Sequence, residues 1–139
     1  MEKLEHIGIA VRNITESNAT FARLLGRDHY KIEEVETEGV RTSFFEIGGI
    51  KIELLEATRD DSPIARFIEK RGEGVHHLAF QVQNMKQSIA RYKEEGFDLV
   101  QETPKKGADD KMICFLHPKT TGGVLIELCE DVNSFSSSR

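Results

Sequence analysis

The feature that most constrains this chain is a nine-residue stretch that it contains twice. Gly48–Glu56 reads GGIKIELLE and Gly122–Glu130 reads GGVLIELCE, with six of the nine positions identical at an offset of 74. A second repeat lies upstream, where His6–Phe21 matches His77–Tyr92 at an offset of 71. Self-similarity at a fixed spacing identifies repeated structural units. Because the spacing is about half of the 139-residue chain, the sequence predicts one duplicated module instead of a solenoid of many repeats.

The alternation of apolar residues and the positions of turn residues predict the order βαβββ in each half. The predicted strands are 4–11, 29–36, 41–47 and 50–57 in the first half, and 75–82, 97–102, 111–117 and 122–130 in the second. A helix follows the first strand of each half, and a short linker helix over 63–71 joins the halves. We therefore expect an α+β fold with a single domain over residues 1–131, built from modules at about 4–57 and 75–130. Residues 132–139 are predicted to form a polar C-terminal tail.

Two histidines and two glutamates are predicted to point away from the apolar faces of their strands. Side chains along a strand point alternately to opposite faces. In each half the first strand has an apolar face, and His6 and His77 lie on the other face, whereas His76 shares the apolar one. In the late strands, Glu53 and Glu127 each lie between two apolar residues and so also point away from the apolar face. We therefore expect the four side chains to line a cavity.

A divalent metal ion is the simplest explanation for these four residues. A carboxylate in the middle of an apolar strand is costly to bury unpaired, and duplication provides carboxylates and imidazoles that can share one ion. Imidazole nitrogens and carboxylate oxygens suit Co²⁺, Ni²⁺, Mn²⁺, Fe²⁺ or Zn²⁺. No cysteine belongs to the set, which argues against a closed structural zinc site. The predicted metal ligands are His6, Glu53, His77 and Glu127.

The other histidines and the cysteines are predicted to have structural roles. His29 is expected on the surface, His76 in packing, and His117, in the segment LHPKTTGG, in a turn. Cys114 and Cys129 are the only cysteines, and both lie in apolar strand-like segments. We therefore expect two buried, reduced thiols.

Composition excludes several classes of protein. The net charge is −5 and the sequence has no long run of Lys or Arg, which argues against a general nucleic-acid surface. No apolar run approaches the roughly 20 residues that a membrane-spanning helix needs. The N-terminus opens directly into a strand-like alternation and lacks the layout of a signal peptide. We therefore expect a cytoplasmic protein that binds neither nucleic acid nor membrane.

The chain resembles the methylmalonyl-CoA epimerases of the vicinal oxygen chelate superfamily along most of its length. The motifs that carry the resemblance are HIGIAV, IELLE followed by DSPIARFIEKRGEGVHHLAFQV, and FLHPKTTGGVLIEL. The resemblance implies two paired βαβββ modules that form a cupped, barrel-like mixed sheet around one metal ion, and a homodimer. It implies the same four ligands, with Co²⁺ favoured and Ni²⁺, Mn²⁺, Mg²⁺ or Zn²⁺ as alternatives. It also implies that Glu127 is a catalytic residue that transfers a proton.

The activity implied by the resemblance is metal-dependent interconversion of (2R)- and (2S)-methylmalonyl-CoA, a reaction of propionate metabolism, by 1,1-proton transfer through a metal-stabilised enolate. The expected small-molecule partner is therefore an acyl-CoA. A basic patch for the CoA moiety is expected among Lys105, Lys106, Lys111 and Lys119. One alternative is a lactoylglutathione lyase like glyoxalase I, and another is a non-catalytic small-molecule-binding protein of the same superfamily.

Two positions depart from the pattern of the relatives. Thr42 stands where some epimerases have a second catalytic glutamate, so the second proton-transfer group is left open, with Glu53 and a metal-bound water among the candidates. Asp109 and Asp110 stand where many relatives have a Gly-Gly pair. The second departure places two negative charges in a loop that the resemblance puts near a polyanionic cofactor.

Overall fold

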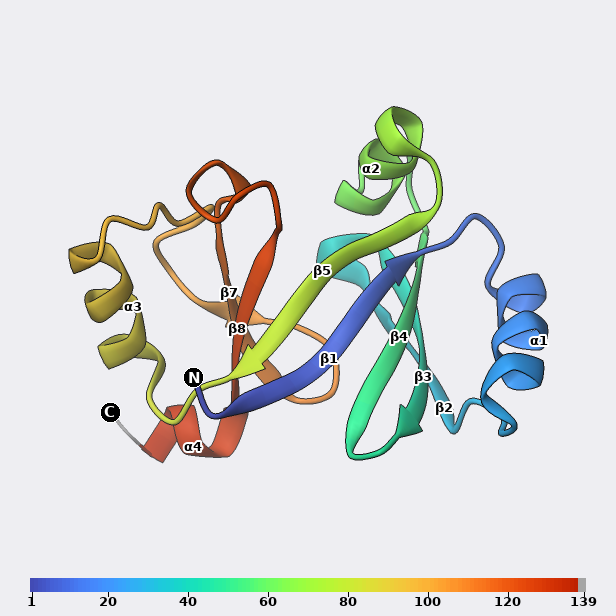
Figure 1. Ribbon diagram of the computed structural model, residues 1–139, viewed down its shortest axis with the longest axis horizontal. Helices are drawn as coiled ribbons and strands as arrows, with labels where there is room; N and C mark the ends of the chain where they lie inside the picture. The colour runs from blue at the N-terminus through green and yellow to red at the C-terminus, as the bar shows by residue number, and fades with distance from the viewer. Residues whose placement is uncertain (138–139) are drawn as a thin grey trace. The chain divides into compact units, whose positions relative to one another are not determined.

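The computed structural model describes residues 1–137 and has the predicted order βαβββ in each half of the chain (Figure 1). The chain divides into two compact units. We call His6–His76 the first unit, and Met1–Glu5 together with the chain from His77 onward the second unit. No helix among the described residues is both long enough and apolar enough to span a lipid bilayer.

The first unit contains four strands, two α-helices and one turn of 3₁₀ helix. The elements are β1 (Lys3–Ala10, whose first three residues belong to the second unit), α1 (Ile14–Leu25), β2 (Lys31–Val35), η1 (Glu36–Glu38), β3 (Val40–Ile47), β4 (Ile50–Ala57) and α2 (Pro63–Arg71). The strand order is β2-β3-β4-β1. β1 runs parallel to β4, and the other neighbours are antiparallel. The parallel pairing follows from the crossover through α1 and β2–β3.

Helix α1 covers one face of these strands because its ends and its apolar side are both specified locally. The Asn13 side chain accepts a hydrogen bond from the backbone N–H of Glu16, which caps the first turn. Gly26 ends the helix in the left-handed conformation, with φ of 72°. Apolar side chains of α1 then pack against the strands; the core here contains Val11, Phe45 and Leu54, with Ile9, Phe21, Ala22, Leu25 and Ile52 against it.

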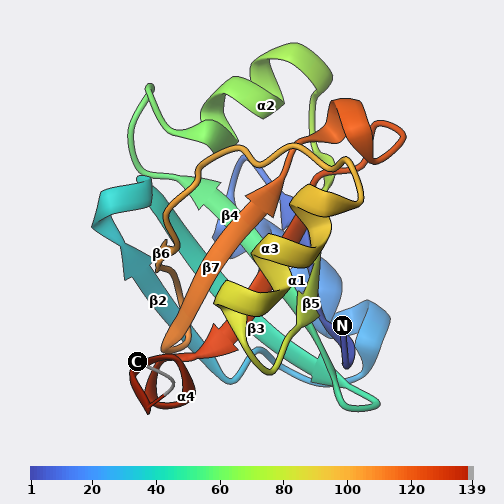
Figure 2. The ribbon, with the colours of Figure 1, turned by 90° about the vertical axis from the view of Figure 1, so that its left-hand side faces the viewer.

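The second unit repeats this arrangement with a shorter edge strand. Its elements are β5 (Gly74–Gln81, whose first three residues belong to the first unit), α3 (Met85–Glu94), β6 (Lys105–Lys106), β7 (Lys111–Leu116), η2 (Pro118–Thr120), β8 (Ile126–Asp131) and α4 (Val132–Ser137). The order is β5-β8-β7-β6, with β5 parallel to β8. Figure 2 faces this unit, with α3 in front of its strands. Met85 and Tyr92 of α3 pack against Cys114 and Leu128.

Three segments of the second unit differ from the prediction. The strand predicted over 122–130 begins only at Ile126, after a turn at Gly122 and Gly123. The strand predicted over 97–102 is wrong: Leu99 forms only an isolated bridge with Leu116, and the regular edge strand is the two-residue β6. The segment has the apolar alternation of a strand, but pairing with a neighbour is not encoded in that alternation. The predicted polar tail begins with a helix, α4, because Phe135 packs against the core of this unit. The last two residues of the predicted tail lie outside the described part of the chain.

Candidate metal centre

In the first unit, His6 and Glu53 form a buried pair. Gly8 of β1 lies opposite Glu53 of β4 in the parallel register, so the side chain of His6, two residues before Gly8, is on the same face as that of Glu53. The distance from His6 Nδ1 to Glu53 Oε2 is 3.1 Å. The two residues are only 5% and 4% exposed. A carboxylate buried this deeply requires a counter-charge or hydrogen-bond donors, and the imidazole provides one of these contacts.

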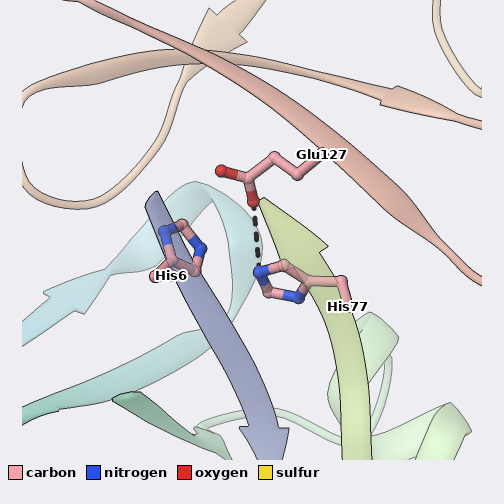
Figure 3. Close-up of side chains that lie close together, drawn as sticks. All are labelled: His6, His77 and Glu127. Carbon is pink, nitrogen blue, oxygen red and sulfur yellow. Dashed lines mark ion pairs between the residues drawn. The ribbon is translucent and has the colours of Figure 1, made fainter. Parts of the chain in front are cut away.

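In the second unit, His77 and Glu127 form the equivalent pair. Ala79 of β5 lies opposite Glu127 of β8, so His77 again stands two residues before the position that faces the glutamate. The distance from His77 Nε2 to Glu127 Oε1 is 3.3 Å, and Figure 3 shows the two side chains pointing toward one another. They are 5% and 4% exposed. The duplicated sequence therefore gives the same histidine–glutamate register in both units.

A phenylalanine that was not predicted from the sequence adjoins each glutamate. Phe44 of β3 lies opposite Glu53, and Phe115 of β7 lies opposite Glu127. The Phe115 ring lies edge-on to the ring of His77, with centroids 5.8 Å apart. Apolar rings beside a buried charge exclude water and strengthen its electrostatic interactions. The sequence contains a clue to this pair, because Phe44 and Phe115 are 71 residues apart, the same offset as between His6 and His77.

The remaining histidines are not part of either pair. His76 packs edge-on against Phe67 at a centroid distance of 5.0 Å, and burial lowers its pKa to about 4, so it is a neutral packing residue near neutral pH. The Nδ1 atom of His117 accepts a hydrogen bond from the backbone N–H of Lys119 and caps η2, which is the predicted turn role. His29, predicted on the surface, is half-buried with its ring near Phe45.

Three of the four lysines predicted for the CoA moiety have acidic neighbours. Lys111 Nζ lies 2.6 Å from Asp131, and Lys119 Nζ lies 3.1 Å from Asp98. Lys106 Nζ lies 3.9 Å from the exposed Asp110. These contacts reduce the net positive charge that a phosphate would meet, so the basic patch stays a prediction.

The two thiols are buried, as predicted. Cys114 and Cys129 are both 0% exposed. Cys114 lies opposite Leu128 in the β7–β8 register, so Cys129 is on the other face of the hairpin and the two thiols point apart. Burial raises the pKa of the Cys114 thiol. The raised pKa makes Cys114 a weaker nucleophile than an exposed thiol.

The donor atoms of the two pairs fit a borderline divalent cation. Each unit presents one imidazole nitrogen and one carboxylate oxygen within 3.3 Å of each other. Such nitrogen and oxygen donors are those that Co²⁺, Ni²⁺, Mn²⁺ and Zn²⁺ accept.

Comparison with known proteins identifies the superfamily and the fold. The family model of the Glyoxalase/Bleomycin resistance protein/Dioxygenase superfamily matches residues 5–115. An uncharacterized protein of Bacillus subtilis (strain 168), YqjC, is 38% identical over 130 residues, which are 94% of this chain and 93% of that protein. The mitochondrial methylmalonyl-CoA epimerase of Bos taurus is 35% identical over 127 residues, 91% of this chain and 73% of that protein.

A solved structure agrees with these matches. A single-residue variant of methylmalonyl-CoA epimerase from Streptomyces coelicolor, in complex with 2-nitronate-propionyl-CoA, has a TM-score of 0.89 and 32% identity, covering 94% of this chain and 95% of that chain. The expected α+β fold of paired βαβββ modules is therefore confirmed. The chain belongs to the glyoxalase/bleomycin resistance protein/dioxygenase superfamily and is a homologue of the methylmalonyl-CoA epimerases within it.

Proposed function

We propose that this chain is a metal-dependent epimerase that interconverts (2R)- and (2S)-methylmalonyl-CoA. The observation that carries the proposal is the buried histidine–glutamate pair, built twice in the same register. The similarity to methylmalonyl-CoA epimerases supports the choice of substrate. The homodimer and the cytoplasmic location stay predictions.

One divalent ion would be held by His6, Glu53, His77 and Glu127. Co²⁺ is the first choice, with Ni²⁺, Mn²⁺, Mg²⁺ or Zn²⁺ as alternatives. The ion would supply a Lewis acid that favours loss of the proton from C2 of the substrate. The burial of both glutamates keeps competing water away from the donor atoms.

Glu127 is the residue that we assign to proton transfer on one side of C2. In methylmalonyl-CoA the C2–H bond lies between a carboxylate and a thioester carbonyl, so proton loss gives a planar enolate. The Glu127 carboxylate accepts this proton, and its position beside His77 and Phe115 fixes the direction from which it acts. General acid–base catalysis by a positioned carboxylate is worth about 10²–10⁴ in rate.

The test is to incubate the metal-loaded protein with one epimer of methylmalonyl-CoA in deuterated water. We expect formation of the other epimer with deuterium at C2, and loss of both after removal of the metal with a chelator. Turnover of the methylglyoxal–glutathione hemithioacetal without deuterium at C2 of methylmalonyl-CoA would instead identify a lactoylglutathione lyase. Acyl-CoA binding that survives removal of the metal, without any turnover, would identify a binding protein.

A further inference from the structure

We propose that the aromatic ring of Phe115 on β7 binds the alkyl group at C2 of the acyl-CoA and limits its size; this inference rests on the proposed function. C2 of methylmalonyl-CoA carries a hydrogen, a carboxylate, a thioester carbonyl and a methyl group. The methyl group is the one substituent that gains free energy by leaving water for an apolar surface. A residue that contacts it therefore decides which alkyl groups the site accepts.

The register of the β7–β8 hairpin places Phe115 directly beside the proposed proton carrier. Phe115 lies opposite Glu127, so the two side chains are on the same face of the hairpin. Cross-strand neighbours have Cβ atoms about 4.5–5.5 Å apart. Because Glu127 is assigned to take the proton from C2, the alkyl group, which is bonded to the same carbon, comes within reach of the ring.

A ring contact gives the same placement independently of the register. The ring of Phe115 lies edge-on to the ring of His77, with centroids 5.8 Å apart and an interplanar angle of 88°. His77 Nε2 is in turn 3.3 Å from Glu127 Oε1. The three side chains therefore form one group within the second unit, and the phenyl ring is its apolar member.

Phe115 keeps accessible surface in this group, whereas two other neighbours of Glu127 do not. Ala79 of β5 lies opposite Glu127, and Cys129 lies two residues after it on the same face; both are 0% exposed. Phe115 packs against these residues but is only half-buried. Its carbonyl oxygen accepts a hydrogen bond from the N–H of Val100 at 2.9 Å, so the backbone is engaged on the edge away from β8 as well. The accessible surface therefore belongs mainly to the ring.

The layer on which the ring rests is already filled, which is the reason for a size limit. Ile113, two residues before Phe115 on the same face, is 7% exposed and packs with Ala79 and Cys129. The loop before β7 closes over it, since a Cβ added to Gly107 would lie 2.8 Å from Ile113 Cδ1. Closely packed interiors yield little space. The ring therefore cannot move aside for a longer alkyl group without displacing this layer.

The equivalent phenylalanine of the first unit offers no such surface. Phe44 lies opposite Glu53 in the corresponding register, but it is 0% exposed. The Lys31 ammonium lies 4.6 Å from its ring centroid, and the ring of Tyr30 lies at a centroid distance of 6.0 Å. Of the two repeated phenylalanines, it is therefore Phe115 that a ligand can contact.

The experiment compares Phe115→Leu with two control variants in the metal-loaded protein. Methylmalonyl-CoA and ethylmalonyl-CoA are assayed for deuterium incorporation at C2 in deuterated water. One methylene at an apolar contact changes kcat/KM by about 10–200-fold, so F115L should raise the ratio of kcat/KM for the ethyl over the methyl substrate by about tenfold or more. The controls, Phe44→Leu and Phe97→Leu, make the same change at a covered ring and at a ring that packs against Tyr92. Both should leave this ratio unchanged.

Phe115→Trp tests the opposite direction. The larger ring should lower kcat/KM for methylmalonyl-CoA by about tenfold or more and spare deuterium exchange at C2 of malonyl-CoA, which has no alkyl group. A purely structural role of Phe115 would change the rates for all three thioesters alike. Because each ratio is measured on one preparation of one variant, a partial loss of folded protein does not alter it.

An unchanged ratio in F115L would overturn the assignment. Leu125, half-buried and two residues before Glu127, is the competing candidate. A rise in the ratio for Leu125→Ala that is absent from F115L would therefore also overturn it. Failure of the proposed function is distinguishable, because the wild type would then incorporate deuterium into none of the three thioesters, and the inference would fall with it.

Discussion

Glu56 and Glu130 occupy equivalent positions at the end of the repeated strand, and each holds the start of a helix. The backbone N–H of Ile14, the first residue of α1, donates to Glu56 Oε2 at 2.9 Å. The backbone N–H of Met85, the first residue of α3, donates to Glu130 Oε1 at 2.9 Å. A carboxylate at a helix N-terminus satisfies a free N–H group and interacts favourably with the helix dipole. Both units therefore anchor a helix to the strand that carries the proposed ligand glutamate.

The two anchors differ at the second oxygen of the carboxyl group. Glu56 Oε1 accepts a hydrogen bond from Arg41, at 2.6 Å. Glu130 is 1% exposed, and its Oε2 atom has no hydrogen-bond partner among the described residues. The register explains this difference, because Arg41 lies opposite Glu56 whereas Met112 lies opposite Glu130. The two units thus share the helix anchor but not the cation that completes it.

The largest expected difference between the units is in catalysis. It appears when the Glu127→Gln variant is compared with the Glu53→Gln variant. Under the proposed mechanism Glu127 is both ligand and proton carrier, so E127Q should lower kcat by about 10²–10⁴-fold. E53Q keeps an amide oxygen that can bind the ion, so it should lower metal affinity and retain more of kcat. Steady-state kinetics at saturating Co²⁺, with metal titration by calorimetry, measures both. Equal losses of kcat would show that the two glutamates have the same role.

The next difference is in the free energy of unfolding, which is compared between the Glu130→Ala and Glu56→Ala variants. Loss of the buried anchor in E130A leaves the N–H of Met85 without its acceptor and creates a cavity, which should cost about 2–4 kcal/mol. The side chain of Glu56 is 17% exposed, so water can replace part of its contacts, and E56A should cost less, about 1–2 kcal/mol. Urea unfolding monitored by circular dichroism checks this. A larger loss for E56A would contradict the argument from burial.

A third prediction makes the second anchor resemble the first. Met112→Arg places a guanidinium opposite Glu130, where it can donate to the unpartnered oxygen and stabilise the protein by about 1 kcal/mol. Met112→Leu is the control, since it changes shape without adding a donor and should give no gain. The gain of M112R should also shrink in the Glu130→Gln background, which a double-mutant cycle measures. An equal gain in both backgrounds would mean that the arginine acts elsewhere.

The smallest expected effect concerns the loops before β3 and β7. The first loop has a glycine, Gly39, at positive φ (64°), whereas the second has Asp109 and Asp110 at φ of 59° and 53°. A left-handed conformation is strained for residues with a side chain, less so for Asp than for most. Asp110→Gly should therefore stabilise the protein by up to about 1 kcal/mol in thermal unfolding. Asp110→Val is the opposite control and should destabilise it.

The sequence predicted the local features of the fold because these depend on neighbouring residues. Strand parity alone placed His6 and Glu53 away from the apolar faces of their strands, and the β1–β4 register puts both on one face. The features that it did not predict depend on which residues of separate strands lie opposite one another. The unpartnered oxygen of Glu130 is one example, because it follows from the position of Met112 in the β7–β8 register.

The same reasoning explains the errors in the second unit and the residues missed at the site. The segment around Leu99 alternates like a strand, but only one bridge to Leu116 forms. The position of Phe115 beside Glu127 becomes evident only when β7 is aligned with β8.

The opposed thiols of the β7–β8 hairpin provide internal reporters of how the second unit opens. Cys114 packs in the core beneath α3, whereas Cys129 packs with Ala79 and Ile113 on the face that carries Glu127. A thiol-alkylating reagent can reach Cys114 only after α3 separates from the hairpin, and Cys129 only after the opposite face is uncovered. The ratio of the two labelling rates, read by mass spectrometry, would therefore tell which side of the hairpin becomes accessible first during a thermal fluctuation.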